Sequence, residues 1–156
     1  MSAVLGDERV KHLEFLQHTI ARLGTNSFLI KGWSMTLSGA LVAVSSSRPT
    51  WTVVVAALMM TMGFWLLDSF YLGQERLFRS LYERASAPTE DLTSDADPAT
   101  PGPATPAPVP MFTMDAERYG TPVTWRAVAL SRTMLLFHGL LALIDLLVAA
   151  SLVGDW

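Results

Sequence analysis

Residues 53–72 read VVVAALMMTMGFWLLDSFYL, an apolar run in which Asp68 is the one charged residue. A helix rises about 1.5 Å per residue, so about 20 residues cross the roughly 30 Å hydrocarbon core of a membrane. Residues 134–153 form a second run of this length, and residues 28–44 form a shorter run that contains Lys31. We therefore predict three membrane-spanning helices, with Lys31 reaching the membrane edge. The alternative for residues 28–44 is a helix buried in a protein core.

The composition of the chain also favours a membrane protein. Of its 156 residues, 51% are hydrophobic and 16% are charged, and the mean hydropathy is +0.35. An average soluble domain has about 25% charged residues. The formal net charge of -3 shows no basic excess, which argues against a nucleic-acid partner. The absence of cysteine excludes disulfides, thiolate catalysis and cysteine-based metal sites.

A polar segment at residues 45–50, SSSRPT, separates the first two runs and predicts a transmembrane hairpin with helices at residues 28–46 and 52–73. Of the 11 lysines and arginines, four lie on the N-terminal side of the hairpin, six lie between the second and third runs, and one lies in the turn. The positive-inside rule then places the N-terminus and the central segment in the cytoplasm and the C-terminus outside. We expect a multi-pass protein of the bacterial cytoplasmic (inner) membrane.

The segment before the hairpin, residues 1–27, predicts a cytoplasmic amphipathic helix. Its apolar residues recur at spacings of three and four, at Val10, Leu13, Leu16, Ile20 and Leu23. This helix lies on the cytoplasmic leaflet or packs against another helix. Residues 74–86 are the predicted partner, because they continue the second membrane helix into the cytoplasm by roughly 20 Å and carry their own apolar seam.

The remaining segments are a linker and the third membrane helix. Residues 87–120 are rich in proline, alanine and threonine, which predicts a disordered linker. Residues 121–156 predict an interfacial segment and then a membrane helix at about residues 133–153, with Thr121 as N-cap of one helix that runs from Pro122 to Val153. The predicted fold is therefore all-α: a transmembrane hairpin, a cytoplasmic helical extension and a third transmembrane helix after a disordered linker.

Ionisable residues inside a membrane are candidates for function by default. Lys31 and Asp68 are nearly equally distant from the hairpin turn, so we expect them at one depth and able to form an ion pair. This pair is either a cytoplasmic gate or a structural clasp that fixes the register of the hairpin.

Ser131, His138 and Asp145 are spaced by seven residues and share one face of the third helix. The carboxyl group of Asp145, near mid-membrane, is expected to be neutral, paired with a histidine or facing water. This polar stripe either lines an oligomeric pore or proton path, or supplies hydrogen bonds between helices.

Small residues form a stripe on the first membrane helix, at Gly32, Thr36, Gly39 and Ala43, and Gly63 lies on the second helix. Small side chains let helices approach closely, so we expect these residues to pack the hairpin; the alternative is a homo-oligomer interface.

Catalytic motifs are absent from the sequence: it has no Gly-rich phosphate loop, no zinc-binding His-Glu motif and no nucleophile elbow. We therefore expect a protein that is not an enzyme, with no metal site and no cofactor. His12 and His18 lie on the predicted amphipathic helix and are expected to be solvated.

Four segments resemble a widespread group of small bacterial membrane proteins of unassigned function: NSFLIKGWS at 26–34, FWLLDSFYL at 64–72, QERLFRSLY at 74–82 and SRT at 131–133. More distantly, a hairpin followed by a cytoplasmic helix resembles the SLATT-type two-helix effectors of bacterial conflict systems. That resemblance implies a membrane-permeabilising role in antiviral defence. The residues that it implies are most important for this role are Lys31, Trp33, Asp68, Tyr71, Glu75 and Arg76.

These observations predict a small, non-enzymatic membrane protein that self-associates in the lipid bilayer and acts as a channel or membrane-permeabilising effector. The alternative is a structural or adaptor subunit that docks a cytoplasmic or membrane protein. Candidate residues for that cytoplasmic interaction are Tyr71, Glu75, Arg76, Arg79 and Tyr82. A third hypothesis is a component of a small proton-coupled transporter that uses His138 and Asp145.

Overall fold

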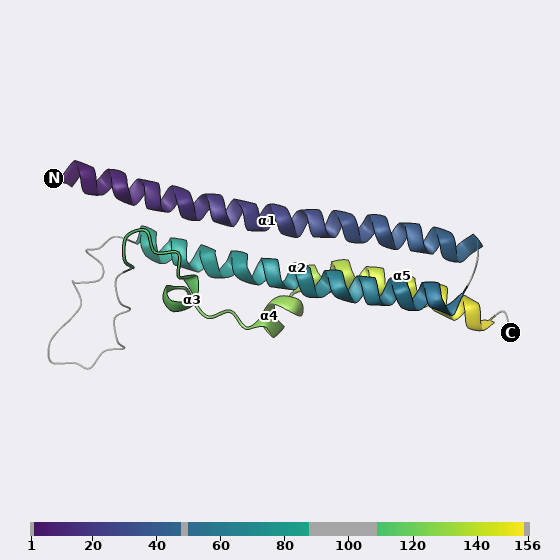
Figure 1. Cartoon of the computed structure of the whole chain (residues 1–156). Coiled ribbons are helices and arrows are strands. Elements are labelled where there is room, and N and C mark those ends of the chain that lie inside the picture. The colour runs from purple at the N-terminus through teal and green to yellow at the C-terminus, as the bar shows by residue number, and fades with distance from the viewer. Residues whose placement is uncertain (1, 48–49, 88–108, 155–156) are drawn as a thin grey trace, which may run out of the picture. The chain divides into compact units, whose positions relative to one another are not determined.

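The computed structural model describes residues 2–47, 50–87 and 109–154, which form five α-helices and no strand. The helices are α1 (Ser2–Ser47), α2 (Trp51–Ser86), α3 (Ala116–Tyr119), α4 (Trp125–Ala129) and α5 (Arg132–Gly154), labelled in Figure 1. Stretches long and apolar enough to cross a membrane lie at Gly6–Ser45, Trp51–Ser86 and Arg132–Ser151. The chain is an all-α membrane protein, as predicted.

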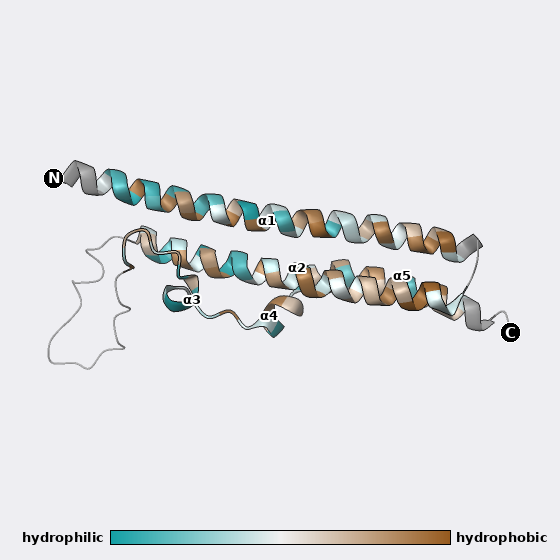
Figure 2. Cartoon of the chain, in the orientation of Figure 1, coloured by the Kyte–Doolittle hydropathy of each residue, from teal (hydrophilic) through white to brown (hydrophobic). Residues whose placement is uncertain are grey.

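α1 differs from the expected pair of helices because it runs without a break from Ser2 to Ser47. The amphipathic helix predicted over residues 1–27 therefore continues directly into the membrane helix, because Gly24 and Asn26 are both helical. One glycine costs a helix interior only about 1 kcal/mol, and no proline interrupts the segment. Figure 2 shows that the polarity nevertheless changes along α1, from a hydrophilic N-terminal part to a hydrophobic C-terminal part. The helix extends through Ser47, and Arg48 and Pro49 of the predicted turn lie outside the described residues.

The chain divides into two compact units. We call the first the head unit; it contains Met1–Arg22 and Gln74–Pro122. We call the second the bundle unit; it contains Leu23–Gly73 and Val123–Trp156.

The core of the head unit joins the N-terminal part of α1 to the C-terminal part of α2, as the sequence predicts. Leu16 and Leu81 are fully buried and pack with Ala116 of α3. Polar contacts flank this core: the Gln17 side-chain amide donates a hydrogen bond to the Tyr82 hydroxyl at 2.8 Å. The Arg9 guanidinium donates to the carbonyls at the end of α2, those of Ala85 at 3.1 Å and Ala87 at 2.5 Å.

The C-terminal part of the predicted linker belongs to this core. Residues 88–108 lie outside the described residues, but α3 lies within the segment that we assigned to the linker. The Asp115 side chain caps α3 by accepting from the Arg118 N–H at 3.1 Å. His12, expected in solvent, is only 3% exposed and its Nε2 lies 3.0 Å from the Thr113 carbonyl oxygen. Ala116 packs against Leu16 and Leu81, which explains why this stretch folds onto the head unit.

Gly120 ends α3 at a close approach to α2. A Cβ atom at this position would lie 3.0 Å from the Leu77 carbonyl oxygen and 2.9 Å from the Ser80 hydroxyl. That hydroxyl also accepts a hydrogen bond from the Thr121 N–H at 2.8 Å. Thr121 is therefore held by α2 and does not cap the helix predicted to start at Pro122.

The single helix predicted over residues 122–153 is also wrong, because α4 ends at Ala129 and α5 begins at Arg132. The Trp65 indole N–H donates to the Ala129 carbonyl at 3.1 Å. In a continuous helix that carbonyl would accept from the N–H four residues later. The indole of α2 thus satisfies a backbone group that the break leaves free. The third membrane helix, predicted at about 133–153, lies within α5.

Candidate functional site in the helix bundle

The bundle unit has a polar interior and an apolar exterior. Its outward side chains include Phe28, Met59 and Leu136, which are 75%, 69% and 74% exposed. Its buried polar side chains come from three helices: Ser27, Ser34, Ser38 and Ser45 of α1; Thr61, Asp68 and Ser69 of α2; and His138 and Asp145 of α5. This arrangement suits a chain whose surroundings are lipid, because polar groups then need partners inside the protein.

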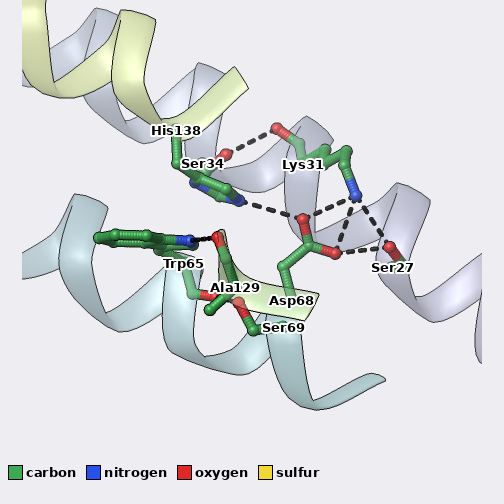
Figure 3. Close-up of polar contacts among 8 residues, drawn as sticks. All are labelled: Ser27, Lys31, Ser34, Trp65, Asp68, Ser69, Ala129 and His138. Carbon is green, nitrogen blue, oxygen red and sulfur yellow. Dashed lines mark hydrogen bonds and ion pairs between the residues drawn. The ribbon is translucent and has the colours of Figure 1, made fainter. Parts of the chain in front are cut away.

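The first polar cluster surrounds Asp68 (Figure 3). Its carboxylate is completely buried, and the Lys31 Nζ atom lies 2.6 Å from Oδ2 and 2.8 Å from Oδ1. The Ser27 hydroxyl donates to Oδ1 at 2.5 Å, and His138 Nε2 lies 3.0 Å from Oδ2. The ion pair that the sequence predicts between Lys31 and Asp68 is therefore present, and α5 supplies a third partner.

The cluster satisfies its charges internally. A carboxylate only accepts hydrogen bonds, so Nε2 of His138 must carry the proton that points at Asp68. Its Nδ1 atom is buried and has no hydrogen-bond partner among the described residues. The Lys31 side chain is 26% exposed, whereas those of Asp68 and His138 are 0% and 1% exposed. The cluster thus opens to its surroundings through the lysine.

The second polar cluster surrounds Asp145 of α5. Its Oδ2 atom accepts a hydrogen bond from the Thr61 hydroxyl at 2.7 Å. Its Oδ1 atom is buried without a partner in the described part of the chain, and so is the Ser45 hydroxyl. Asp145 and Ser45 both line one small cavity between α1, α2 and α5. A carboxyl group with one free oxygen can still bind a ligand or exchange a proton.

The stripe of Ser131, His138 and Asp145 faces the interior of a single chain. His138 and Asp145 are both 2% exposed and bond to α2, as the interhelical hydrogen-bond interpretation predicts. Ser131 lies at the break before α5, and its hydroxyl is buried without a partner among the described residues. A pore between copies of the chain would need these side chains on the outer surface, so the stripe does not fit an oligomeric pore lining.

The predicted small-residue packing of the hairpin is wrong. Gly32, Thr36, Gly39, Ala43 and Gly63 are all exposed. No atom of the described residues lies within 4 Å of the place where a Cβ would stand on Gly32, Gly39 or Gly63. The physical reason is that hydrogen bonds to Asp68 and Asp145 orient the polar faces of the helices toward the interior of the bundle, and the small residues lie on other faces. A homo-oligomer interface at these small residues stays a prediction.

Sequence reasoning missed the buried face of α1, which carries Ser27, Ser34, Ser38 and Ser45. The signal was their spacing of seven, four and seven residues, which keeps them on one side of a helix. The glycines of this helix carry the packing prediction instead, because small residues are common at membrane helix interfaces. Serine hydroxyls often bond their own helix, as Ser34 does to the Lys31 carbonyl at 2.9 Å.

The five cytoplasmic interaction candidates do not form one cluster. Tyr71 belongs to the bundle unit and meets Phe70 edge to face, with ring centroids 5.7 Å apart. In the head unit, Arg79 pairs with Glu75 at 2.6 Å, and Tyr82 accepts the bond from Gln17. Arg76 is half-buried in the same unit.

Comparisons of this chain with protein-family models, curated proteins and solved structures find no match.

Proposed function

We propose that this protein is a small, non-enzymatic membrane channel that conducts protons along the polar interior of each bundle unit. The observation that carries the proposal is the location of its titratable side chains. Asp68, His138 and Asp145 are nearly fully buried between helices whose outward faces are apolar. Burying ionisable groups in a membrane costs free energy, so their presence at the centre calls for a role.

The polar groups form successive layers along the bundle. His138 and Asp145 are separated by seven residues of α5, which corresponds to roughly 10 Å along a helix axis. Asp68 and Thr61 have the same separation on α2 and bond to those two residues. A proton cannot cross such a distance in one step, and the buried hydroxyls of Ser34 and Ser38 on α1 supply polar groups for water between the layers.

This proposal restricts the predicted channel to protons and excludes a wide pore for larger solutes. A pore for larger solutes would need polar side chains on the lipid-facing surface, where copies of the chain would meet. In a bacterial inner membrane, a proton path would dissipate the proton gradient. Dissipation of the gradient would be one form of the membrane permeabilisation that the resemblance of the hairpin and its cytoplasmic helix to antiviral effectors implies.

The test uses the full-length protein in liposomes that contain a pH-sensitive dye, with a potassium gradient and valinomycin to drive proton movement. We expect proton flux that stops in Asp145→Asn, which keeps the size of the side chain and removes its titration. Ser151→Ala is the matched control, because Ser151 is exposed on the same helix and bonds its own backbone. Absence of flux in the wild type, or equal flux in Asp145→Asn, would contradict the proposal. Leakage of a trapped organic dye would indicate a wide pore instead.

A second candidate function is the adaptor role. Among the described residues of the head unit, five large apolar side chains are at least 42% exposed: Val10, Phe15, Met111, Phe112 and Met114. Phe112 also has a φ of 59°, a backbone conformation that non-glycine residues rarely adopt. Exposed apolar side chains on a folded unit favour contact with another protein.

The adaptor role predicts a stoichiometric partner in the native membrane. Purification of the tagged full chain in mild detergent should retain that partner, and Phe112→Ser should release it while leaving proton flux unchanged. Val55→Ser, at an exposed position of the bundle unit, is the control substitution. Recovery of the chain alone, with flux intact, would reject this second candidate.

A further inference from the structure

We propose that the cavity beside Asp145 binds one water molecule, and that this water is the proton donor and acceptor for the Asp145 carboxyl group. The site deepens the proton-channel proposal and rests on it for its purpose. The cavity lies near the hairpin end of the bundle: Ser45 is two residues from the last residue of α1, and Val54 is three residues after the first residue of α2. Its lining also includes Leu41, Ala57 and Val148.

Two unpartnered polar atoms belong to the wall of this cavity. Asp145 is 2% exposed with Oδ1 free of any hydrogen bond in the described structure, and Ser45 is 4% exposed with a free hydroxyl. A buried polar group without a partner costs free energy that a bound water removes. A carboxyl oxygen and a hydroxyl together offer an acceptor and a group that both donates and accepts.

The chemistry of the lining selects water over other ligands. All lining residues except Asp145 and Ser45 are apolar, so an anion or a polar organic molecule has no recognition groups there. A metal cation that prefers oxygen ligands binds about six or more of them. These two side chains offer only about two, so they cannot complete such a site. A buried water needs about two to four polar partners.

The two oxygen atoms of the Asp145 carboxyl group have different roles in this site. The Thr61 hydroxyl donates to Oδ2, which fixes the orientation of the carboxyl group. Oδ1 then carries the exchangeable proton. When the O–H bond at Oδ1 breaks, the proton bonds to the water oxygen and gives a hydronium ion and a carboxylate; the reverse step reloads Oδ1. Among the residues that line the cavity, Asp145 is the sole titratable one.

Infrared spectroscopy of the full-length protein in liposomes tests this site without relying on flux. A protonated carboxyl group has a C=O stretch that shifts in D₂O, and the band that disappears in Asp145→Asn is the band of Asp145. We expect this band in the wild type. The time that its shift takes after a change to D₂O measures the rate of proton exchange. Ser45→Ala removes the second partner of the water and should slow the exchange about fivefold. Ser45→Val also fills the cavity and should slow it about tenfold or more.

Ser151→Ala is again the matched control and should exchange at the wild-type rate. The proposal is overturned if no band depends on Asp145 between about pH 4 and about pH 9, or if Ser45→Val exchanges as fast as the wild type. Removal of the band by Na⁺ at constant pH would identify a metal cation as the ligand and would equally overturn it. If the band behaves as expected while liposomes show no proton flux, the water site stands and the channel proposal falls.

Discussion

The two buried carboxyl groups of the bundle are equally hidden from solvent but differ in their partners. Asp68 accepts from a lysine, a serine and a histidine, and these donors come from two other helices. Asp145 accepts from one threonine hydroxyl, and its Oδ1 has no partner in the described part of the chain. The difference teaches that burial alone does not define a role for an intramembrane acid. The number of donors decides whether the charge is fixed in place or remains available.

The energetic consequences of the two arrangements are opposite. A buried carboxylate is tolerated when a counter-charge and hydrogen bonds compensate its desolvation, and the Asp68 cluster has both. Removing one partner of such a cluster leaves another charge uncompensated. The one hydrogen bond that the described structure gives Asp145 comes from the uncharged Thr61 side chain, so burial of this carboxyl group depends more on a proton or a water than on an ionic partner.

The largest predicted effect separates the two acids by stability. Asp68→Ala leaves Lys31 without its partner and should destabilise the protein by about 3–5 kcal/mol. Asp145→Ala removes one interhelical hydrogen bond and should cost about 1 kcal/mol. Unfolding of both variants in mild detergent, followed by circular dichroism, measures the difference. Equal destabilisation would show that both clusters are structural.

Charge reversal tests the Asp68 cluster as a pair. Lys31→Asp alone and Asp68→Lys alone should each reduce the yield of folded protein in the membrane, while the double reversal should restore part of it, because the two charges interact directly. The matched control is the exposed pair of Lys11 and Asp7, 2.8 Å apart on the surface of the head unit. Reversing that pair should change stability by at most about 1 kcal/mol. A double reversal no better than the single ones would rule out the pairing.

A substitution in the head unit tests whether the environment of Asp145 depends on the bundle unit alone. Gly120→Ala places a Cβ against the Leu77 carbonyl and should cost about 1–3 kcal/mol in the head unit. Amide exchange around Leu81 should become faster, and the infrared band of Asp145 should not change. Gly63→Ala, where the new Cβ has no described neighbour within 4 Å, is the control and should leave both readouts unaltered. A change in the Asp145 band would link the two units energetically.

The smallest predicted effect concerns the single donor of Asp145. Thr61→Val keeps the shape of the side chain and removes its hydroxyl, which should cost about 0.6 kcal/mol. In a double-mutant cycle with Asp145→Asn, the two losses should not add, because both substitutions alter the same bond. Additive losses would mean that this hydrogen bond contributes nothing measurable to stability.

The sequence predicted the features that depend on counting along the chain. The three membrane helices follow from the length of apolar runs, and the depth of Lys31 and Asp68 follows from their distance to the hairpin turn. The packing of Leu16 against Leu81 follows from amphipathic spacing in two neighbouring segments.

The features that depend on how each helix rotates about its axis escaped prediction. Small residues and serines lie on different faces of α1, and the sequence alone allows either face to pack against a neighbouring helix. The hydrogen bonds among all three helices determine which face is buried. The same holds for His138, which shares a face with Asp145 but bonds to Asp68. The end of α4 depends on the Trp65 indole, a partner 64 residues away in sequence from Ala129.

The break between α4 and α5 also makes the geometry of the bundle tolerant to changes in chain length. Since α5 starts anew at Arg132, an added residue before that point alters α4 and leaves the angular phase of α5 as it is. An added residue between Arg132 and His138 would instead swing everything beyond it by about 100° around the helix axis. A one-residue insertion should therefore be tolerated better upstream of the joint, where it does not turn His138 and Asp145 of α5 away from α2.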